Sequence, residues 1–367
     1  MPTILRRFLA VLAAAVMVLG LVAYSDDLVN AQQASPLRPP AFELDPKWPN
    51  IPNNWVLGEV SSIAVDSRDH IWVLHRPRSI PADKRANSAP PVLEFDTAGK
   101  LLGSWGGDGT GFDWPEREHG ISVDTKGFVW ISGNGGWPKP TPGGSTDDMI
   151  LKFTNAGKFV MQIGKRGQST GDADTMNVHQ PADVFVHAPT NELYVADGYG
   201  NHRVIVFDSD TGQFKRMWGA FGKPPGGVDR CTVTAPKSFA DAEAIPDYNV
   251  VHAIRVANDG LVYVADRENR RLQMFTADGG FVKQLVKADV TFARDLAFSP
   301  DPAQQFLYVG GGKGIYIVDR MTLDILGMIQ VPGQLGPGHH IATDSKGNIY
   351  IAQTAAGLQK LVFKGMK

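Results

Sequence analysis

One pattern recurs six times along the chain and constrains its fold more than any other feature. Each copy runs from an apolar, alternating segment through a polar turn to a second segment of the type xYVA. A third segment, often ending in Phe-Asp, follows after another polar turn. Period-two alternation, β-branched and aromatic residues and Gly-containing turns predict β-strands in every copy. The copies begin near Ser62, Gly120, Asp183, Ala253, Asp295 and His340.

Fourth segments such as KLLGSWG, KFVMQIG and QFKRMWG complete most copies. Four-stranded units of about 40–60 residues, repeated six times, predict an all-β fold, a six-bladed β-propeller. The sixth copy ends at Lys367, just after its third strand. The segment AFELDPKW before the first copy can supply the missing outer strand. We therefore expect an N-terminal strand to close the ring and to remove an exposed sheet edge.

The N-terminal segment has the composition of a secretory signal peptide. Two arginines precede an apolar run from Phe8 to Ala23, and a small-residue site follows. The run is short for a membrane span and its far side is not basic, so we expect cleavage, no remaining membrane span, and a secreted or periplasmic protein. The expected organisation is a signal peptide at 1–31, a linker with the closing strand at 32–55, and the propeller at 56–367.

Charge and cysteine content exclude several classes of protein. The formal net charge of −2 does not favour a nucleic-acid partner. The single cysteine, Cys231, excludes internal disulfides. Stability must then come from an apolar core, which a chain of 367 residues can bury.

Three histidines stand where propeller geometry lets side chains converge. The first strand of each blade lies beside the central axis, and the second runs back antiparallel to it, so loops that enter strand one and leave strand two share a face. His119, His252 and His339 precede the first strands of blades two, four and six. Alternate blades are roughly 120° apart in a six-fold ring. Three imidazoles around an open position suit catalytic zinc, and other first-row metals bind them too.

A plainer interpretation of these histidines stays open. A lone histidine is more often a hydrogen-bonding residue than a ligand. His179 also stands at a blade entrance, in blade three, where it would break the three-fold set. With nine histidines in the chain, some coincidence of position is expected.

Three further residues open on the same face. Arg76, Tyr199 and Arg267 follow the second strands of blades one, three and four. An arginine fork matches a carboxylate, and a tyrosine near a cation can act as a base. The adjoining Asp-x-x-x-Asn-x-Arg and Asp-x-x-Asn-x-Arg sequences, which begin at Asp197 and Asp266, are typical of turns instead, and we interpret them as structural. We expect the two aspartates to cap their turns and the asparagines and arginines to pair across blades.

These segments resemble a known family. The repeat resembles the NHL type, and nearly the whole mature chain is similar to the peptidyl-α-hydroxyglycine α-amidating lyase family. The resemblance rests on EHGISVDTKGFVWIS, HQPADVFVHAPTNELYVADGYGNHRVIVF, VHAIRVANDGLVYVADRENRRLQMF and GHHIATDSKGNIYIA.

The resemblance implies a zinc enzyme. Its metal ligands would be His119, His252 and His339, and its active-site side chains would be Tyr199, Arg76 and Arg267. The implied reaction cleaves an N-acyl- or peptidyl-α-hydroxyglycine to an amide and glyoxylate, so the expected partner is a small-molecule or peptide substrate ending in such a group. Where the family has an aspartate of a calcium site this chain has His340, so calcium is not expected.

Two other functions stay open as alternatives. A non-catalytic NHL-repeat propeller could bind a protein or a glycan in the cell envelope, and a lactonase-like hydrolase could use the same fold with another metal. Lactonase-like propellers hold calcium with carboxylates and asparagine, whereas this chain places histidines at the centre. A binding module gives no reason for three histidines beside two arginines and a tyrosine.

Overall fold

The computed structural model describes residues 37–137, 145–226, 245–287, 292–330 and 338–367. The strands all belong to the unit Pro39–Lys367. The expected signal peptide at 1–31 and Cys231 lie outside the described residues. Within the described ranges, no helix is long and apolar enough to cross a bilayer.

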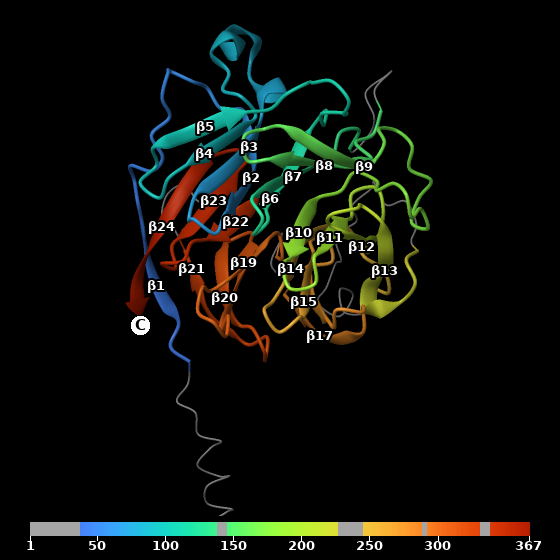
Figure 1. Cartoon of the computed structure of the whole chain (residues 1–367). Coiled ribbons are helices and arrows are strands. Elements are labelled where there is room, and N and C mark those ends of the chain that lie inside the picture. The colour runs from blue at the N-terminus through green and yellow to red at the C-terminus, as the bar shows by residue number, and fades with distance from the viewer. Residues whose placement is uncertain (1–36, 138–144, 227–244, 288–291, 331–337) are drawn as a thin grey trace, which may run out of the picture. The chain divides into compact units, whose positions relative to one another are not determined.

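Six antiparallel sheets of four strands each form the blades of a propeller (Figure 1). Blade one contains β2 (Glu59–Val65), β3 (Ile71–Arg76), β4 (Val92–Phe95) and β5 (Leu101–Trp105), and blade two contains β6 (Glu118–Val123), β7 (Phe128–Gly133), β8 (Met149–Thr154) and β9 (Phe159–Gly164). Blade three contains β10 (Asp183–His187), β11 (Glu192–Asp197), β12 (Arg203–Asp208) and β13 (Phe214–Trp218), and blade four contains β14 (Val251–Val256), β15 (Val262–Asp266), β16 (Arg271–Phe275) and β17 (Phe281–Val286). Blade five contains β18 (Leu296–Phe298), β19 (Phe306–Gly311), β20 (Gly314–Asp319) and β21 (Ile325–Ile329), and blade six contains β22 (His340–Thr343), β23 (Ile349–Gln353), β24 (Gly357–Met366) and β1 (Pro40–Leu44). The predicted six-bladed, all-β fold is confirmed.

The first strand of each blade lines the axis. Each of these strands contacts its counterpart in the next blade, in the order β2, β6, β10, β14, β18, β22 and back to β2. The ring is therefore continuous. Because the inner strands all run in the same direction along the axis, their first residues all lie at one mouth of the central channel and their last residues at the other.

The N-terminal strand completes the last blade. β1 pairs antiparallel with β24, with Phe42 opposite Phe363 and Leu44 opposite Leu361. The Phe42 ring also packs on Tyr308 of blade five, with 5.8 Å between ring centroids. The segment AFELDPKW thus supplies the outer strand that the sixth copy lacks, and β24 is paired on both sides.

The turn between the first two strands of a blade explains the recurring aspartate. Asp124 Oδ1 accepts hydrogen bonds from the backbone N–H groups of Lys126 and Phe128, both at 2.9 Å. Its Oδ2 accepts from Trp130 Nε1 at 2.9 Å, and Trp130 is fully buried. One carboxylate therefore shapes the turn and anchors a core side chain of the second strand.

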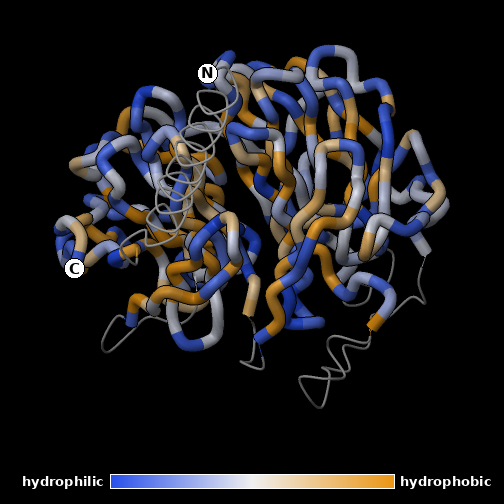
Figure 2. The backbone as a smooth tube through the Cα atoms, turned by 90° about the horizontal axis from the view of Figure 1, so that it is seen from below, coloured by the Kyte–Doolittle hydropathy of each residue, from blue (hydrophilic) through white to orange (hydrophobic). Residues whose placement is uncertain are grey.

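Apolar side chains fill the space between neighbouring blades. Between blades one and two, for example, Trp72, Val129 and Met149 are completely buried and belong to one cluster. Figure 2 shows apolar segments within the blades and mostly hydrophilic turns between them. The helices of the described residues are short 3₁₀ turns, η1 (Pro77–Ser79), η2 (Ala82–Asn87) and η3 (Ala220–Gly222).

Candidate metal centre

The three histidines selected from the sequence lie together on the axis. His119 and His252 are the second residues of β6 and β14, and His339 directly precedes β22. All three are buried. One ring nitrogen of each lies within 4.8 Å of those of the other two. The ring centroids are 4.7–5.0 Å apart. The expected convergence is present, and the role of these residues as metal ligands stays a prediction.

A backbone carbonyl fixes the tautomer of each imidazole. In each ring Nδ1 lies within hydrogen-bond distance of a carbonyl oxygen, and a carbonyl can only accept, so Nδ1 carries the proton and Nε2 is the nitrogen with a lone pair. Second-shell carbonyls of this kind orient metal-binding histidines. The acceptors for His119, His252 and His339 are the carbonyls of Ala182 (2.7 Å), Arg294 (2.7 Å) and Ser61 (2.5 Å).

The three imidazoles are held in their neutral form. Burial lowers the pKa of each histidine well below its usual range. The second-largest cause is the charge of a neighbouring side chain. His339 lowers the pKa of His119, Arg267 lowers that of His252, and His340 lowers that of His339. Neutral imidazole is the form that binds a metal. The donor set, its tautomer and its charge state therefore suit zinc or a similar first-row ion.

Tyr199 covers the centre from blade three. It lies two residues after β11, and its side chain is buried. Its hydroxyl oxygen is 2.9 Å from Nε2 of His119 and 3.2 Å from Nε2 of His252. Arg267 donates a hydrogen bond to the same oxygen from Nη1 at 2.8 Å. The phenol oxygen is therefore placed between the histidines and a guanidinium group.

Arg76 and Arg267 each have a carboxylate partner. Arg76, at the end of β3, donates from Nη1 to Glu59 Oε2 (2.5 Å) and from Nε to the Glu118 carbonyl (2.7 Å). Arg267 donates from Nε to Glu268 Oε1 at 2.6 Å. Arg267 thus contacts Tyr199 directly, whereas Arg76 acts on the histidines through its charge, which lowers the pKa of His119 and His339.

The structure adds two arginines and a tryptophan that the sequence interpretation missed. Arg117 precedes β6, Arg294 precedes β18, and both lie close enough to Tyr199 for their charges to interact. The Trp137 ring packs against Tyr199 at 5.0 Å between centroids. Arg294 occupies a blade entrance, the same kind of position that selected the histidines, but its lack of a carboxylate partner among the described residues is visible only in the structure.

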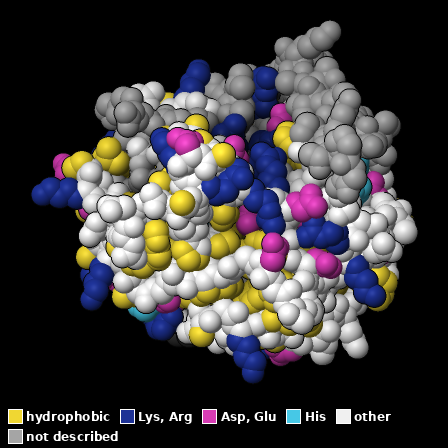
Figure 3. Space-filling model, turned by 90° about the horizontal axis from the view of Figure 1, so that it is seen from above, with side chains coloured by type: hydrophobic (Ala, Val, Ile, Leu, Met, Phe, Trp, Pro, Cys, Tyr) yellow, Lys and Arg dark blue, Asp and Glu magenta, His cyan; other side chains and the backbone are white. Residues whose placement is uncertain are grey.

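A cavity of about 310 Å³ opens beside this network. Arg117 and Trp137 link it to Tyr199. The other lining residues are Glu59, Arg76, Arg78, Ser79, Glu116, Gly135 and Gly136. On one face of the molecule, shown in Figure 3, Lys and Arg side chains gather near the middle with acidic side chains beside them. A substrate with polar and anionic groups suits a cavity of this composition.

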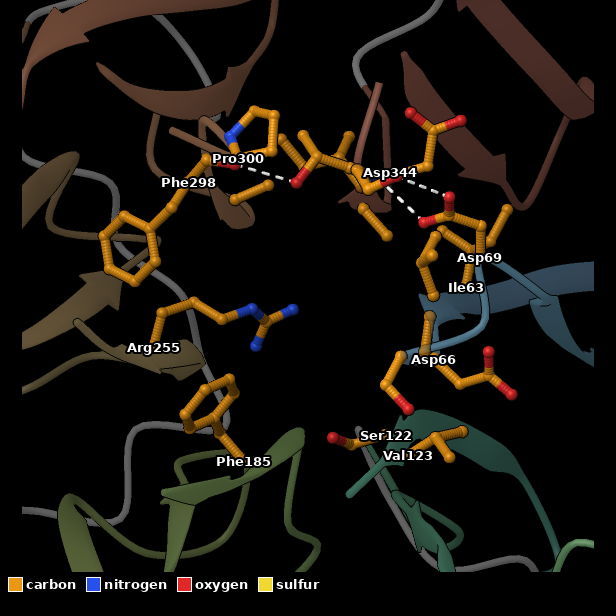
Figure 4. A pocket seen from close by; sticks show the side chains of 18 of the residues that line it. Ile63, Asp66, Asp69, Ser122, Val123, Phe185, Arg255, Phe298, Pro300 and Asp344 are labelled. Carbon is orange, nitrogen blue, oxygen red and sulfur yellow. Dashed lines mark hydrogen bonds between the residues drawn. The ribbon is translucent and has the colours of Figure 1, made fainter. Parts of the chain in front are cut away.

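A second cavity, of about 360 Å³, lies at the other mouth of the channel, where the inner strands end. Figure 4 shows Arg255 reaching into it between Phe185 and Phe298. Arg255 also forms ion pairs with the buried Asp183 and, at 3.3 Å, with Asp295. None of the three histidines lines this cavity, so the chemistry is expected at the opposite mouth.

His340 lies between these two regions. It is fully buried, its ring centroid is 5.0–5.5 Å from those of the three histidines, and Nδ1 is 3.6 Å from Asp295 Oδ2. Ligand atoms of Asp183, Asp295 and His340 lie within 4.8 Å of one another, but Arg255 already supplies a cation there. The expectation that calcium is not bound at His340 stays a prediction.

His179 does not join the centre. Its ring is partly exposed, and its backbone N–H donates to Asp197 Oδ1 at 2.8 Å. The aspartates of the two turn sequences hold the asparagine and arginine of their own turns: Asp197 binds Asn201 and Arg203, and Asp266 binds Asn269 and Arg271. These residues are structural, as the sequence indicated, and their side chains pair within a blade rather than with a neighbouring blade.

Comparison with known proteins identifies the repeat. The model of the NHL repeat matches residues 179–207, a stretch that contains Tyr199. The chain is a six-bladed propeller that contains an NHL repeat. This propeller is 27% identical over 313 residues to NHL repeat-containing protein 3 of Mus musculus, which covers 83% of this chain and 74% of that protein. It is 25% identical over 348 residues to peptidyl-alpha-hydroxyglycine alpha-amidating lyase 1 of Drosophila melanogaster, covering 83% of this chain and 57% of the relative.

A solved structure shares the fold. The streptogramin B lyase structure superposes with a TM-score of 0.54 at 14% identity and covers 88% of this chain and 98% of that one. At this identity the likeness speaks for the propeller alone. The match covers a little over half the length of the amidating lyase, and the relatives include proteins with and without an enzyme's name.

Proposed function

We propose that this NHL-repeat propeller is a metal-dependent carbon–nitrogen lyase that cleaves N-acyl- or peptidyl-α-hydroxyglycines to an amide and glyoxylate. The observation that carries the proposal is the contact of Tyr199 Oη with two histidines of a neutral three-histidine centre and with Arg267. Similarity to an amidating lyase supports the same activity. Export of the protein, suggested by the apolar run Phe8–Ala23, belongs to the proposal as well.

Different residues would bind the substrate, transfer the proton and hold the metal. An arginine fork, from Arg76 or Arg267, would bind the substrate carboxylate. Tyr199, as phenolate, would take the proton of the substrate hydroxyl, and the hydrogen bond from Arg267 would stabilise the negative charge on Oη. The C–N bond then breaks as the hydroxyl oxygen forms the aldehyde of glyoxylate, and the amide nitrogen receives a proton. His119, His252 and His339 would hold the zinc, whose Lewis acidity would polarise a substrate oxygen.

Burial of the site favours this division of roles. The three histidines, Tyr199, Arg76 and Arg267 are all at most 8% exposed. Charges interact more strongly in such a water-poor site than at the surface. A propeller that only binds a protein or glycan would need no such set of buried, oriented groups, and a lactonase-like hydrolase would need a water nucleophile beside the centre rather than a tyrosine.

Glyoxylate release from α-hydroxyhippurate tests the proposal. Purified mature protein loaded with zinc should produce benzamide and glyoxylate in equal amounts. Lys100→Gln, an exposed change in the turn between β4 and β5 at the opposite mouth, serves as a matched control and should keep full activity. Zinc-loaded protein that releases no glyoxylate would contradict the assigned reaction and would leave only the metal centre.

A further inference from the structure

Four arginines from four different blades lie at the mouth that holds Tyr199. Arg76 is the last residue of the second strand of blade one, Arg267 follows that of blade four, and Arg117 and Arg294 precede the first strands of blades two and five. Arg117 interacts electrostatically with Arg76, Tyr199 and Arg267, and Arg294 with Arg267 and Tyr199. In addition, Arg294 supplies the carbonyl that binds His252 Nδ1 at 2.7 Å, so its backbone lies directly at the centre.

Two of these arginines have no carboxylate of their own. Glu59 pairs with Arg76, and Glu268 pairs with Arg267. Arg117 shares Glu59, whose Oε2 is 3.8 Å from its Nη2. Arg294 has no ion pair among the described residues, and its Nε is buried without a hydrogen-bond partner. A buried guanidinium nitrogen without a partner is costly, and such exceptions point to a missing ligand.

The ion pairs of this mouth leave one arginine over. Arg76 and Arg117 share Glu59, and Arg267 pairs with Glu268, so among the described residues Arg294 has no carboxylate at ion-pair distance. Burial lowers the pKa of Arg117 and Arg294, and the nearby Arg76 and Arg267 respectively lower it further. Burial and a like charge both disfavour the charged guanidinium group, so an anion bound beside Arg294 would stabilise it. The carboxylate of an α-hydroxyglycine is assigned to Arg76 or Arg267, which leaves Arg294 for another anionic group.

We propose that the substrate carries a second anionic group and that Arg294 binds it. This inference rests on the proposed function, which defines the substrate as an N-acyl-α-hydroxyglycine. The glycine half of an N-acyl-α-hydroxyglycine offers only its carboxylate, its hydroxyl group and a hydrogen atom, so the second anion must lie on the acyl side of the C–N bond. The substrate is therefore a compact dianion, such as an N-acyl-α-hydroxyglycine whose acyl chain ends in a carboxylate or phosphate, rather than a neutral peptide amide.

Binding of two nearly isosteric ligands tests the inference without turnover. N-succinylglycine has two carboxylates, and N-succinamoylglycine has a neutral amide in place of the distal one; neither has the reactive hydroxyl group. Isothermal titration of the zinc-loaded protein should show at least tenfold tighter binding of the dianion. The preference should fall to about twofold or less in Arg294→Gln, survive in part in Arg294→Lys, and stay complete in the Lys100→Gln control.

The outcomes separate this inference from the proposed reaction. Equal affinity of the wild-type protein for the two ligands would overturn the dianion inference, and so would a preference that survives in Arg294→Gln. If N-succinyl-α-hydroxyglycine gives no glyoxylate although the dianion preference is present, the lyase reaction fails and the anion site stands. Thermal unfolding of Arg294→Gln near the wild-type temperature would show that any lost preference reflects the missing guanidinium group.

Discussion

Backbone carbonyls decide the chemistry of the central histidines. Each imidazole donates a hydrogen bond from its Nδ1–H to a carbonyl of a neighbouring blade, which leaves three Nε2 atoms without a proton and aimed at one place. Tyr199 Oη lies against two of these nitrogens and accepts from Arg267. In the proposed reaction this hydroxyl group would exchange a proton with the substrate while its ring stays packed against Trp137.

Removal of that hydroxyl group should separate metal binding from turnover. Tyr199→Phe is expected to keep the fold and the metal, because the phenol contributes no imidazole. It should lower kcat for glyoxylate release by about 10²–10⁴-fold, the usual contribution of a positioned base. Metal analysis of the variant checks that the metal is retained, and steady-state kinetics of the same preparation check the loss of kcat. Turnover within threefold of wild type would remove Tyr199 from the mechanism.

His75 should make stability depend on pH. It is fully buried, accepts from the Gly58 N–H at Nδ1 (3.1 Å) and donates from Nε2 to the Pro90 carbonyl (3.0 Å). Burial lowers its pKa from 6.5 to about 4. Between these values the unfolded chain binds the extra proton, so the free energy of unfolding falls as pH drops from 6.5 towards 4.

The size of this effect follows from the shift. Each pH unit is worth about 1.4 kcal/mol, so His75 should remove about 3 kcal/mol of stability by pH 4. Urea unfolding at several pH values, compared with His75→Gln, measures the contribution. The variant should have a flatter dependence over this window, and an identical slope in both proteins would contradict the assignment.

The sequence could predict most of this site but not all of it. The positions of His119, Tyr199 and Arg267 followed from strand order alone, because the two kinds of loop must open on one face. Arg294 was missed although it occupies an equivalent entrance. An arginine at one blade entrance becomes notable only when its lack of a carboxylate partner is seen, and that depends on which side chains of other blades reach it.

At the scale of strands and turns, buried ion pairs fix the turns and the connections between blades. Arg203, at the start of β12, donates to Asp197 Oδ2 at 2.8 Å, and both side chains are completely buried. The same guanidinium donates to backbone carbonyls of Asp172 and Asn177, in the loop that leads from blade two to blade three. One residue therefore fixes both its own turn and the connection that precedes Tyr199.

Loss of Arg203 should lower the free energy of unfolding substantially. Arg203→Met leaves Asp197 buried and without its cation, which typically costs about 3–5 kcal/mol. Lys126→Met is the matched control, because Lys126 pairs with Asp210 at the surface, where both side chains are about half exposed, and it should cost less than about 1 kcal/mol. Thermal or urea unfolding compares the two. Similar losses for both variants would show that the buried pair has no special role.

For these turns, the sequence predicted the turn itself but not all of the partners of its side chains. The Asp-x-x-x-Asn-x-Arg spacing indicates a structural turn, and the structure agrees. The partners of Arg203 in the preceding loop could not be predicted, because the path of an insertion depends on tertiary packing rather than on periodicity. For the same reason the sequence favoured pairing across blades where the aspartate of the same turn is the partner.

For the whole molecule, closure of the ring is the main requirement. β1 pairs with β24, so the N-terminal segment and the C-terminal strand lie in one blade. The six-fold repeat and the missing last strand of the sixth copy predicted this pairing, since an open ring would leave an exposed sheet edge. Loops with no period, such as Pro77–Pro91 with its two 3₁₀ turns, could be predicted only as loops.

Weakening of the closing strand should destabilise the whole propeller. Phe42 packs on Phe363 in its own blade and on Tyr308 of blade five, across the seam between blades five and six. Because the ring is half-buried, Phe42→Ala should cost roughly 2 kcal/mol, somewhat less than a fully buried phenylalanine. The exposed neighbour Glu43 gives the control, Glu43→Ala, which should be nearly neutral. An unchanged unfolding midpoint for Phe42→Ala would mean that the strand does not contribute to stability.

Metal content is the measurement that tests the central claim most directly. Purified wild-type protein, saturated with zinc and then dialysed, should retain about one ion per chain, and His252→Ala should retain far less while His179→Ala retains the wild-type amount. Protein that stays metal-free, or a His252→Ala variant that still binds one ion per chain, would contradict a three-histidine centre on the propeller axis.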